Sequence, residues 1–242
     1  MPEIRAVVAA AGRGTRAGLP YPKTLFPIRG KPILIRLVEL LSAFDRSPTV
    51  VVSPDGRTMI ADCLASSGCE AHLVVQQEAR GMGDAVLRFE DSPSYKHADH
   101  VLLVWGDIPF IQPATLSAVI QVHIERGNDF SFATRHVDSA YTIVSRNAMD
   151  EVTSIVETRE LGIDQPQPGE RDIGLFLFRK DTVFAALRED LPGKYGGATS
   201  EHGFLYIVEN LVNRGFRVEA LPVATDLDLV SLNSMNDLDP YL

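Results

Sequence analysis

Short apolar runs alternate with helical patterns over the first 138 residues, and this alternation limits the possible folds more than any other feature. Runs typical of buried strands occupy residues 4–10, 49–53, 71–77, 99–107 and 129–137. Apolar residues at helical spacing lie between them, at residues 32–44, 55–68, 83–91 and 113–127. Such alternation favours right-handed crossovers and a mostly parallel sheet covered by helices on both faces. We therefore expect an α/β fold.

The pattern changes after residue 138. Shorter and more polar strands are predicted at residues 141–147, 151–160 and 171–180, followed by a final strand at 216–223. A long amphipathic helix is predicted over 199–215, with Thr199 or Ser200 as its cap. No linker or repeat divides the chain, so we expect one domain over 1–242, made of two halves at 1–138 and 139–242.

Composition excludes several classes of partner. The formal net charge of −9 argues against nucleic acid and anionic membranes. No run of 18 apolar residues could span a bilayer, and the N-terminus lacks the basic start and long apolar core of a signal peptide. Cys63 and Cys69 lack the spacing of a metal or redox motif. We expect a cytoplasmic protein, and the sequence leaves its oligomeric state open.

Positive charge is concentrated near the N-terminus. Residues 4–38 contain no acidic residue but seven basic ones, namely Arg5, Arg13, Arg16, Lys23, Arg29, Lys31 and Arg36. A positive segment on an acidic chain predicts a localised anion site, although a solvated basic face would also explain the charges.

A glycine-rich loop follows the first predicted strand. Gly12 and Gly14 would let backbone N–H groups approach an anion closely. A Walker A loop is excluded because no lysine follows a glycine in that motif's spacing. The dinucleotide fingerprint matches at residues 12, 14 and 17, but a glycine and two prolines within 18–22 prevent the helix that it requires. Arginines 13 and 16 can add charge, and the prolines would present Lys23 as a fixed point charge, which suits a triphosphate.

This stretch, AAGRGTR…PK…PIRGKPIL, resembles the signature of sugar nucleotidyltransferases, in particular the uridylyltransferase domain of N-acetylglucosamine-1-phosphate uridylyltransferases. The resemblance implies a Rossmann-like, GT-A-like fold, with a mostly parallel mixed sheet sandwiched by helices. We then expect the half at 1–138 to bind the nucleotide and the half at 139–242 to bind the second substrate, a sugar phosphate. The resemblance implies that Lys23 and Arg16 are catalytic. It also implies a nucleotide-binding loop made of Ala10, Ala11, Gly12, Arg13 and Gly14.

Two further segments extend the resemblance. QQEARGMGDAV (76–86) is similar to the family's base-binding segment, which implies that Gln76, Gly81 and Met82 contact the base. Met82 and Asp84 replace the usual Thr and His, so a base other than uracil stays open. VLLVWGDIPFI (101–111) is similar to the family's metal-binding motif and implies Asp107 as a Mg²⁺ ligand. A carboxylate at the carboxyl end of a parallel strand suits that role, although an Asp before Ile-Pro could also serve only a turn.

The second half carries weaker similarities. They imply a sugar-binding set made of Asp172, Glu157, Tyr141 and Glu201. Asp172 stands where the family has Asn, and the segment after Tyr141 lacks the family's glycine. VSLNSMNDL (230–238) is similar to the family's closing segment and implies Asn233 as the second metal ligand, although a turn or cap would also explain this residue.

The resemblance implies a Mg²⁺-dependent nucleotidyltransferase that couples a nucleoside triphosphate, with UTP favoured, to a sugar 1-phosphate such as N-acetylglucosamine 1-phosphate, with release of pyrophosphate. Two alternatives stay open: a cytidylyltransferase or other enzyme with a different acceptor, and a non-catalytic nucleotide-binding regulator. The chain ends at Leu242 without hexapeptide repeats, so no β-helix acyltransferase domain is expected.

Overall fold

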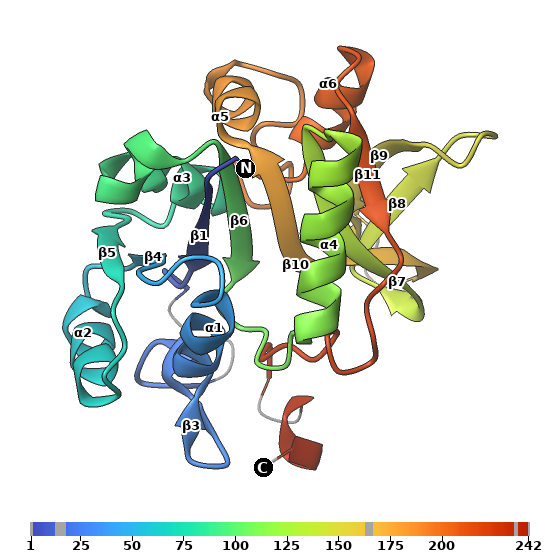
Figure 1. The fold of residues 1–242 in the computed structure, drawn as a ribbon. Helices are drawn as coiled ribbons and strands as arrows, with labels where there is room; N and C mark the ends of the chain where they lie inside the picture. The colour runs from blue at the N-terminus through green and yellow to red at the C-terminus, as the bar shows by residue number, and fades with distance from the viewer. Residues whose placement is uncertain (1, 13–17, 163–166, 235–236, 242) are drawn as a thin grey trace. The chain divides into compact units, whose positions relative to one another are not determined.

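The structure is a computed structural model that describes residues 2–12, 18–162, 167–234 and 237–241 (Figure 1). Its residue contacts divide the chain into two compact units. Unit 1 consists of Met1–Ala79, Ala85–Pro113 and Asp226–Leu242, and unit 2 of Arg80–Asp84 and Ala114–Thr225. These units are defined by residue contacts. The predicted division at residue 138 is a different one, because it concerns which substrate each half binds, and it stays a prediction.

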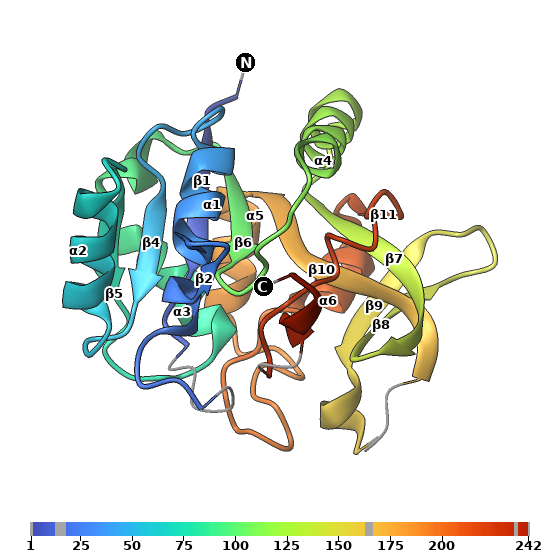
Figure 2. The ribbon, with the colours of Figure 1, turned by 90° about the horizontal axis from the view of Figure 1, so that it is seen from below.

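Unit 1 contains a parallel sheet of four strands. In spatial order they are β6 (His100–Trp105), β1 (Ile4–Ala9), β4 (Thr49–Val52) and β5 (His72–Val75), and Figure 2 shows them side by side. The residues of β4 are all buried, as an apolar strand covered on both faces should be. The last residues of β1 and β6, Ala9 and Trp105, are partners in the ladder, so the loops that follow both strands start at one edge of the sheet.

Helices and short turns complete unit 1. Helix α1 (Ile33–Leu41) starts after Pro32 and buries six of its apolar residues, in line with its amphipathic pattern. The other elements are η2 (Lys23–Leu25), the hairpin of β2 (Pro27–Ile28) and β3 (Lys31–Pro32), α2 (Arg57–Ser66), η3 (Arg88–Asp91), η4 (Pro93–His97) and η7 (Asp239–Tyr241). Helix α3 (Met82–Leu87) crosses from unit 2 into unit 1.

Unit 2 is built around two long strands and a short one beside them. Their order is β11 (Val218–Leu221), β7 (Phe130–Ala140) and β10 (Gln167–Arg179), with β11 parallel and β10 antiparallel to β7. The remaining elements are the antiparallel pair β8 (Thr142–Arg146) and β9 (Val152–Glu157), the turn η5 (Thr158–Leu161), and the helices α4 (Pro113–Arg126), α5 (Lys180–Arg188) and α6 (Ile207–Asn213). Five buried rings form the centre of its core, those of Phe130, Phe132, Phe176, Phe178 and Phe204.

The expected α/β class with a mixed, mostly parallel arrangement of strands is confirmed. The prediction of one long helix over 199–215 is wrong, because α6 covers only the last part of that range. Neither Thr199 nor Ser200 caps a helix, and Ser200 has a φ of 56°. The N–H of His202 donates instead to the carbonyl oxygen of Arg80, so this backbone pairs with a distant segment rather than with its own preceding turn. In the described part of the chain, no helix is long and apolar enough to cross a membrane.

Candidate functional site

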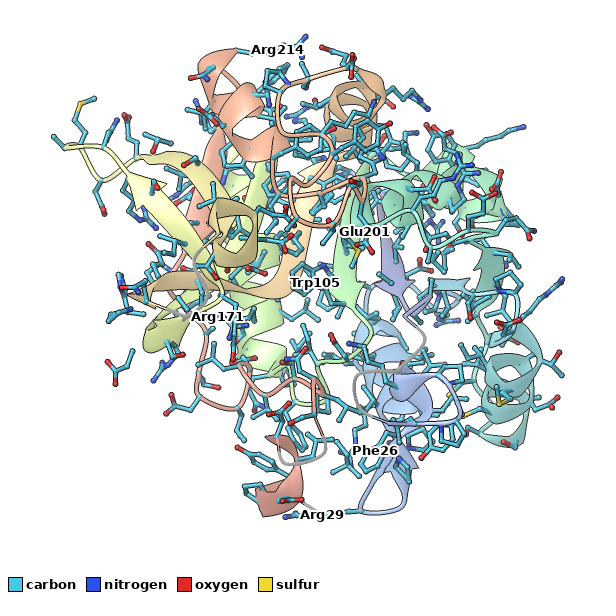
Figure 3. The ribbon with its side chains drawn as sticks, turned by 180° about the vertical axis from the view of Figure 1, so that it is seen from behind. Phe26, Arg29, Trp105, Arg171, Glu201 and Arg214 are labelled. Atoms are coloured by element: carbon cyan, nitrogen blue, oxygen red, sulfur yellow. The ribbon has the colours of Figure 1, made fainter. Side chains whose placement is uncertain are left out.

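A close approach of two strand ends positions Asp107. Gly106 follows β6 directly, after Trp105, which Figure 3 labels at the end of that strand. The N–H of Gly106 donates to the carbonyl oxygen of Ala9 at 3.0 Å, and a Cβ at Gly106 would lie 2.7 Å from that oxygen. Only glycine fits between the ends of β1 and β6, and it places Asp107 beside the start of the glycine-rich loop.

The segment that carries Lys23 is held by close packing. Pro22 is buried and directly precedes the short turn η2. A Cβ at Gly56 would lie 2.7 Å from the Cγ atom of Pro22. The Cε atom of Lys23 lies 3.5 Å from the position that a Cβ would take at Gly12. The stem of Lys23 therefore passes beside the first glycine of the predicted anion-binding loop.

Lys23 and Asp107 form an ion pair at this edge of the sheet. The Lys23 ammonium also donates a longer hydrogen bond, 3.5 Å, to the carbonyl oxygen of Leu232, whose own N–H donates to the backbone oxygen of Asp107 at 2.9 Å. The side chains of Lys23 and Asp107 are 25% and 14% exposed, so a ligand could reach both. Three segments that are distant in the sequence thus meet at one point of unit 1.

Asn233 follows Leu232 and is exposed. Its backbone N–H donates to Asp237 at 2.9 Å and its side-chain nitrogen donates to the Ser231 hydroxyl at 2.8 Å. The second bond uses the side-chain nitrogen, so the side-chain oxygen of Asn233 is the atom that could bind a cation.

The donor chemistry of Asp107 and Asn233 fits a magnesium ion, which prefers carboxylate and amide oxygens. The ammonium of Lys23 already lies against Asp107, which shows that this point favours a positive charge. Among the described residues, no group of three or more His, Cys, Asp or Glu side chains could hold a metal. Further ligands of a bound Mg²⁺ would therefore come from water and substrate phosphates.

The predicted nucleotide loop begins as expected at the end of β1. Ala10 is buried and its N–H donates to Val51 at 2.9 Å, Ala11 is half-buried, and Gly12 is exposed. Gln76 is 5% exposed and its N–H donates to Val52 at 2.9 Å, at the same edge of the sheet. Arg13, Gly14 and Arg16 lie outside the described residues, so their roles stay predictions.

The second part of the predicted base site belongs to unit 2. Gly81 has a φ of +106°, and a Cβ built on it would lie 2.9 Å from the Cβ atom of Glu201. Met82 is half-buried at the start of α3. Gly81, predicted to contact the base, is thus close to Glu201, which is predicted to contact the sugar.

Tyr141 and Glu157 also come together in unit 2. Thr142, next to Tyr141, pairs with Glu157 between β8 and β9, and the Thr158 N–H donates to the Tyr141 carbonyl oxygen at 2.9 Å. Tyr141 is 60% exposed, so its ring is open to a ligand.

Asp172 is placed differently from the other predicted sugar-binding residues. It is 1% exposed and accepts hydrogen bonds from the Thr142 hydroxyl at 2.6 Å and from the Gly174 N–H at 2.8 Å. Burial raises the pKa of Asp172, against the lowering effect of these hydrogen bonds. The carboxylate connects β10 to the first residue of β8, and it is shielded from a ligand in this conformation.

Sequence reasoning missed three contributors to these arrangements. Gly56 supports Pro22, the carbonyl oxygen of Leu232 contacts Lys23, and His202 bonds to the Arg80–Gly83 backbone. Their partners are far away along the chain or on the backbone, so no local pattern could reveal them.

A family model described as the MobA-like NTP transferase domain matches residues 6–166. The chain belongs to this family. This membership confirms the resemblance to nucleotidyltransferases that the glycine-rich loop and the Gly-Asp motif predicted.

Curated relatives of this MobA-like chain carry the name bifunctional protein GlmU. The chain is 25% identical over 237 residues to the one from Hydrogenovibrio crunogenus and 28% identical over 236 residues to the one from Caldanaerobacter subterraneus, which is 97% of this chain and 50% of each relative. It is 32% identical over 186 residues to the one from Oceanobacillus iheyensis, which is 76% of this chain and 40% of the relative. The chain therefore spans about half the length of the curated relatives it matches.

Solved structures share the fold. A protein assigned as a glucose-1-phosphate thymidylyltransferase from Bacillus anthracis, in complex with a sucrose, superposes with a TM-score of 0.76 at 16% identity, covering 98% of this chain and 93% of its own. A UDP-glucose pyrophosphorylase complexed with UDP-glucose superposes with a TM-score of 0.71 at 19% identity, covering 95% of this chain and 96% of its own. These similarities confirm the predicted nucleotidyltransferase-like fold of this MobA-like chain.

Proposed function

We propose that this chain transfers a nucleotidyl group from a nucleoside triphosphate to a sugar 1-phosphate and releases pyrophosphate. The observation that carries the proposal is the Lys23–Asp107 pair, placed beside Gly12 at the carboxyl ends of β1 and β6. Ligands of open α/β sheets bind at that edge, and membership of the MobA-like NTP transferase family supports a triphosphate as one of them.

In the proposed reaction, a phosphate oxygen of the sugar 1-phosphate forms a bond to the α-phosphorus of the triphosphate. The bond from that phosphorus to the β-phosphate oxygen breaks in line, and the electron pair leaves with pyrophosphate. Phosphoryl chemistry of this kind depends on positioning and charge stabilisation rather than on a protein nucleophile. No side chain of the chain has to form a covalent bond.

Lys23 would stabilise the charge that develops on the α-phosphoryl oxygens, where a fixed cation contributes most. Its ammonium has to leave the Asp107 carboxylate to reach a phosphate. Arg16 would hold the β- and γ-phosphates together with the backbone of the loop formed by Ala10, Ala11, Gly12, Arg13 and Gly14. Mg²⁺ held by Asp107 and Asn233 would neutralise phosphate charge when bound.

The base and the acceptor would be bound by separate sets of residues. The Gln76 amide, which is 5% exposed in this conformation, would have to turn toward the ligand to present its donor and its acceptor group to a pyrimidine edge, and Gly81 and Met82 would lie along the base. Glu157, Tyr141 and Glu201 would contact the sugar. Asp172 would contribute indirectly, because its carboxylate is buried and holds Thr142, the residue next to Tyr141. UTP and N-acetylglucosamine 1-phosphate are the proposed pair, in line with the resemblance to uridylyltransferases.

The test is a matrix of the four nucleoside triphosphates against several sugar 1-phosphates with Mg²⁺, with pyrophosphate release as the readout. We expect the fastest release with UTP and N-acetylglucosamine 1-phosphate. Faster release with CTP would favour the cytidylyltransferase alternative. If every pair gives no pyrophosphate while a triphosphate raises the melting temperature, the chain is a nucleotide-binding regulator and the proposed activity is wrong.

A further inference from the structure

Two segments of unit 2 that are far apart in the sequence pair through their backbones. They are the Arg80–Gly83 turn, whose last two residues begin α3, and the Glu201–Gly203 segment. The N–H of His202 donates to the Arg80 carbonyl oxygen at 2.7 Å, and the N–H of Gly83 donates to the His202 carbonyl oxygen at 3.0 Å. One residue of the second segment therefore bonds to both ends of the turn.

The contact between these two segments leaves no space for a side chain on the turn. A Cβ at Gly81 would lie 2.5 Å from the carbonyl oxygen of His202. A Cβ at Gly83 would overlap the carbonyl oxygen of Gly203 and would lie 2.7 and 2.8 Å from two atoms of the His202 ring. Because backbone oxygens cannot move away as a flexible side chain can, the two segments can be this close only with glycine in the turn.

His202 is enclosed at this contact. It is 7% exposed, its ring lies 5.9 Å from that of Tyr195, and its Nε2 atom lies 3.4 Å from the Tyr206 hydroxyl oxygen. Burial and then the positive charge of Lys194 lower its pKa, while Asp84 opposes them, so the ring is neutral near pH 7. A neutral, enclosed ring packs against Gly83 as a fixed surface.

We propose that Gly83 and His202 are positioning residues that join the base-contacting turn and the acceptor-contacting Glu201 into one rigid element. This inference rests on the proposed function, in which Gly81 and Met82 contact the base and Glu201 contacts the sugar. A shift of the turn must then shift Glu201 as well, because two hydrogen bonds and direct backbone contact connect them. Binding of the triphosphate and binding of the sugar phosphate therefore weaken together when this contact is disturbed.

The test compares two Gly→Ala variants in steady-state kinetics of pyrophosphate release. Gly83→Ala forces the two segments apart, and we expect the KM values for both substrates to rise by about tenfold or more while kcat changes less. Gly197→Ala is the matched control, because nothing lies within 4 Å of its added methyl group. We expect both KM values of the control to stay within about twofold of the unmodified chain.

A second variant keeps the test possible if Gly83→Ala does not fold. His202→Ala keeps the backbone hydrogen bonds but removes the ring from Gly83, and we expect both KM values to rise together by a smaller factor, with a cooperative thermal melt. A rise for one substrate only, or for neither, in the variants that fold would overturn the coupling. The proposed function would still stand in that case, provided that the unmodified chain releases pyrophosphate.

If the unmodified chain releases none, the proposed function fails, and calorimetric titration with UTP and with the sugar phosphate then tests the coupling. A joint loss of affinity in His202→Ala would support it, and an unequal or absent loss would overturn it.

Discussion

Lys23 and a divalent cation should compete for the same carboxylate. Replacing Lys23 with methionine keeps a long unbranched side chain and removes only the ammonium that now pairs with Asp107. A hydrogen bond to a charged group contributes about 1.5–3 kcal/mol net, and less where solvent screens it. Since the two side chains are 25% and 14% exposed, we take about 1–2 kcal/mol for the pair. Lys23→Met should therefore bind a divalent cation about 5- to 30-fold more tightly.

The assay is a titration of the substrate-free chain with Mn²⁺, in which electron paramagnetic resonance measures the free ion. Lys31→Met is the matched control, because Lys31 pairs with Glu39 on the surface and the same change there should leave Mn²⁺ affinity unaltered. Asp107→Asn should weaken Mn²⁺ binding, because it removes the charged ligand.

The same Lys23→Met variant should lose activity although it binds the cation better. Loss of one group that stabilises transition-state charge costs about 10²–10³-fold in kcat. Unchanged or weaker Mn²⁺ binding would refute the competition for Asp107. Undiminished pyrophosphate release would refute the role of Lys23 at the α-phosphate.

Three further predictions concern one glycine beside the site and two buried residues of unit 2. Gly106→Ala places a methyl group 2.7 Å from the Ala9 carbonyl oxygen, so urea denaturation should show a free energy of unfolding lower by about 1–3 kcal/mol. Pyrophosphate release should also fall, because Asp107 is displaced. Phe130→Ala removes a buried ring whose centroid lies 5.8 Å from that of Phe178, on which it stacks. Urea denaturation should show a free energy of unfolding lower by about 3–5 kcal/mol. Burial raises the pKa of Glu170, but hydrogen bonds from Arg146 and a threonine outweigh it and hold the pKa below the ordinary value of 4.5. The stability contributed by Glu170 is thus present above pH 4.5 and lost as the pH falls through its lowered pKa. Thermal melts should therefore show that the melting temperature of Glu170→Gln falls less steeply with decreasing pH than that of the unmodified chain.

The sequence by itself determined which elements form in the first half of the chain. The apolar runs that became β1, β4, β5 and β6 are short, rich in β-branched residues and bounded by polar or helical stretches, so local preference and burial agree. Asp107 could also be predicted as a site residue, because an acidic residue at the end of an apolar strand in an α/β pattern lies where ligands bind.

Only the tertiary structure decided which distant segments meet. It placed β6 and β4 on either side of β1, brought Lys23 and Leu232 to Asp107, and paired His202 with the Arg80–Gly83 turn. The same pairing takes the place of the first part of the helix predicted over 199–215, of which only Ile207–Asn213 is helical. Asp172 is buried and bonds to Thr142 of its own chain, so it does not face a ligand. Helix and strand preferences depend on near neighbours in the sequence. The partners of a loop's backbone and of a buried carboxylate depend on what tertiary packing brings beside them.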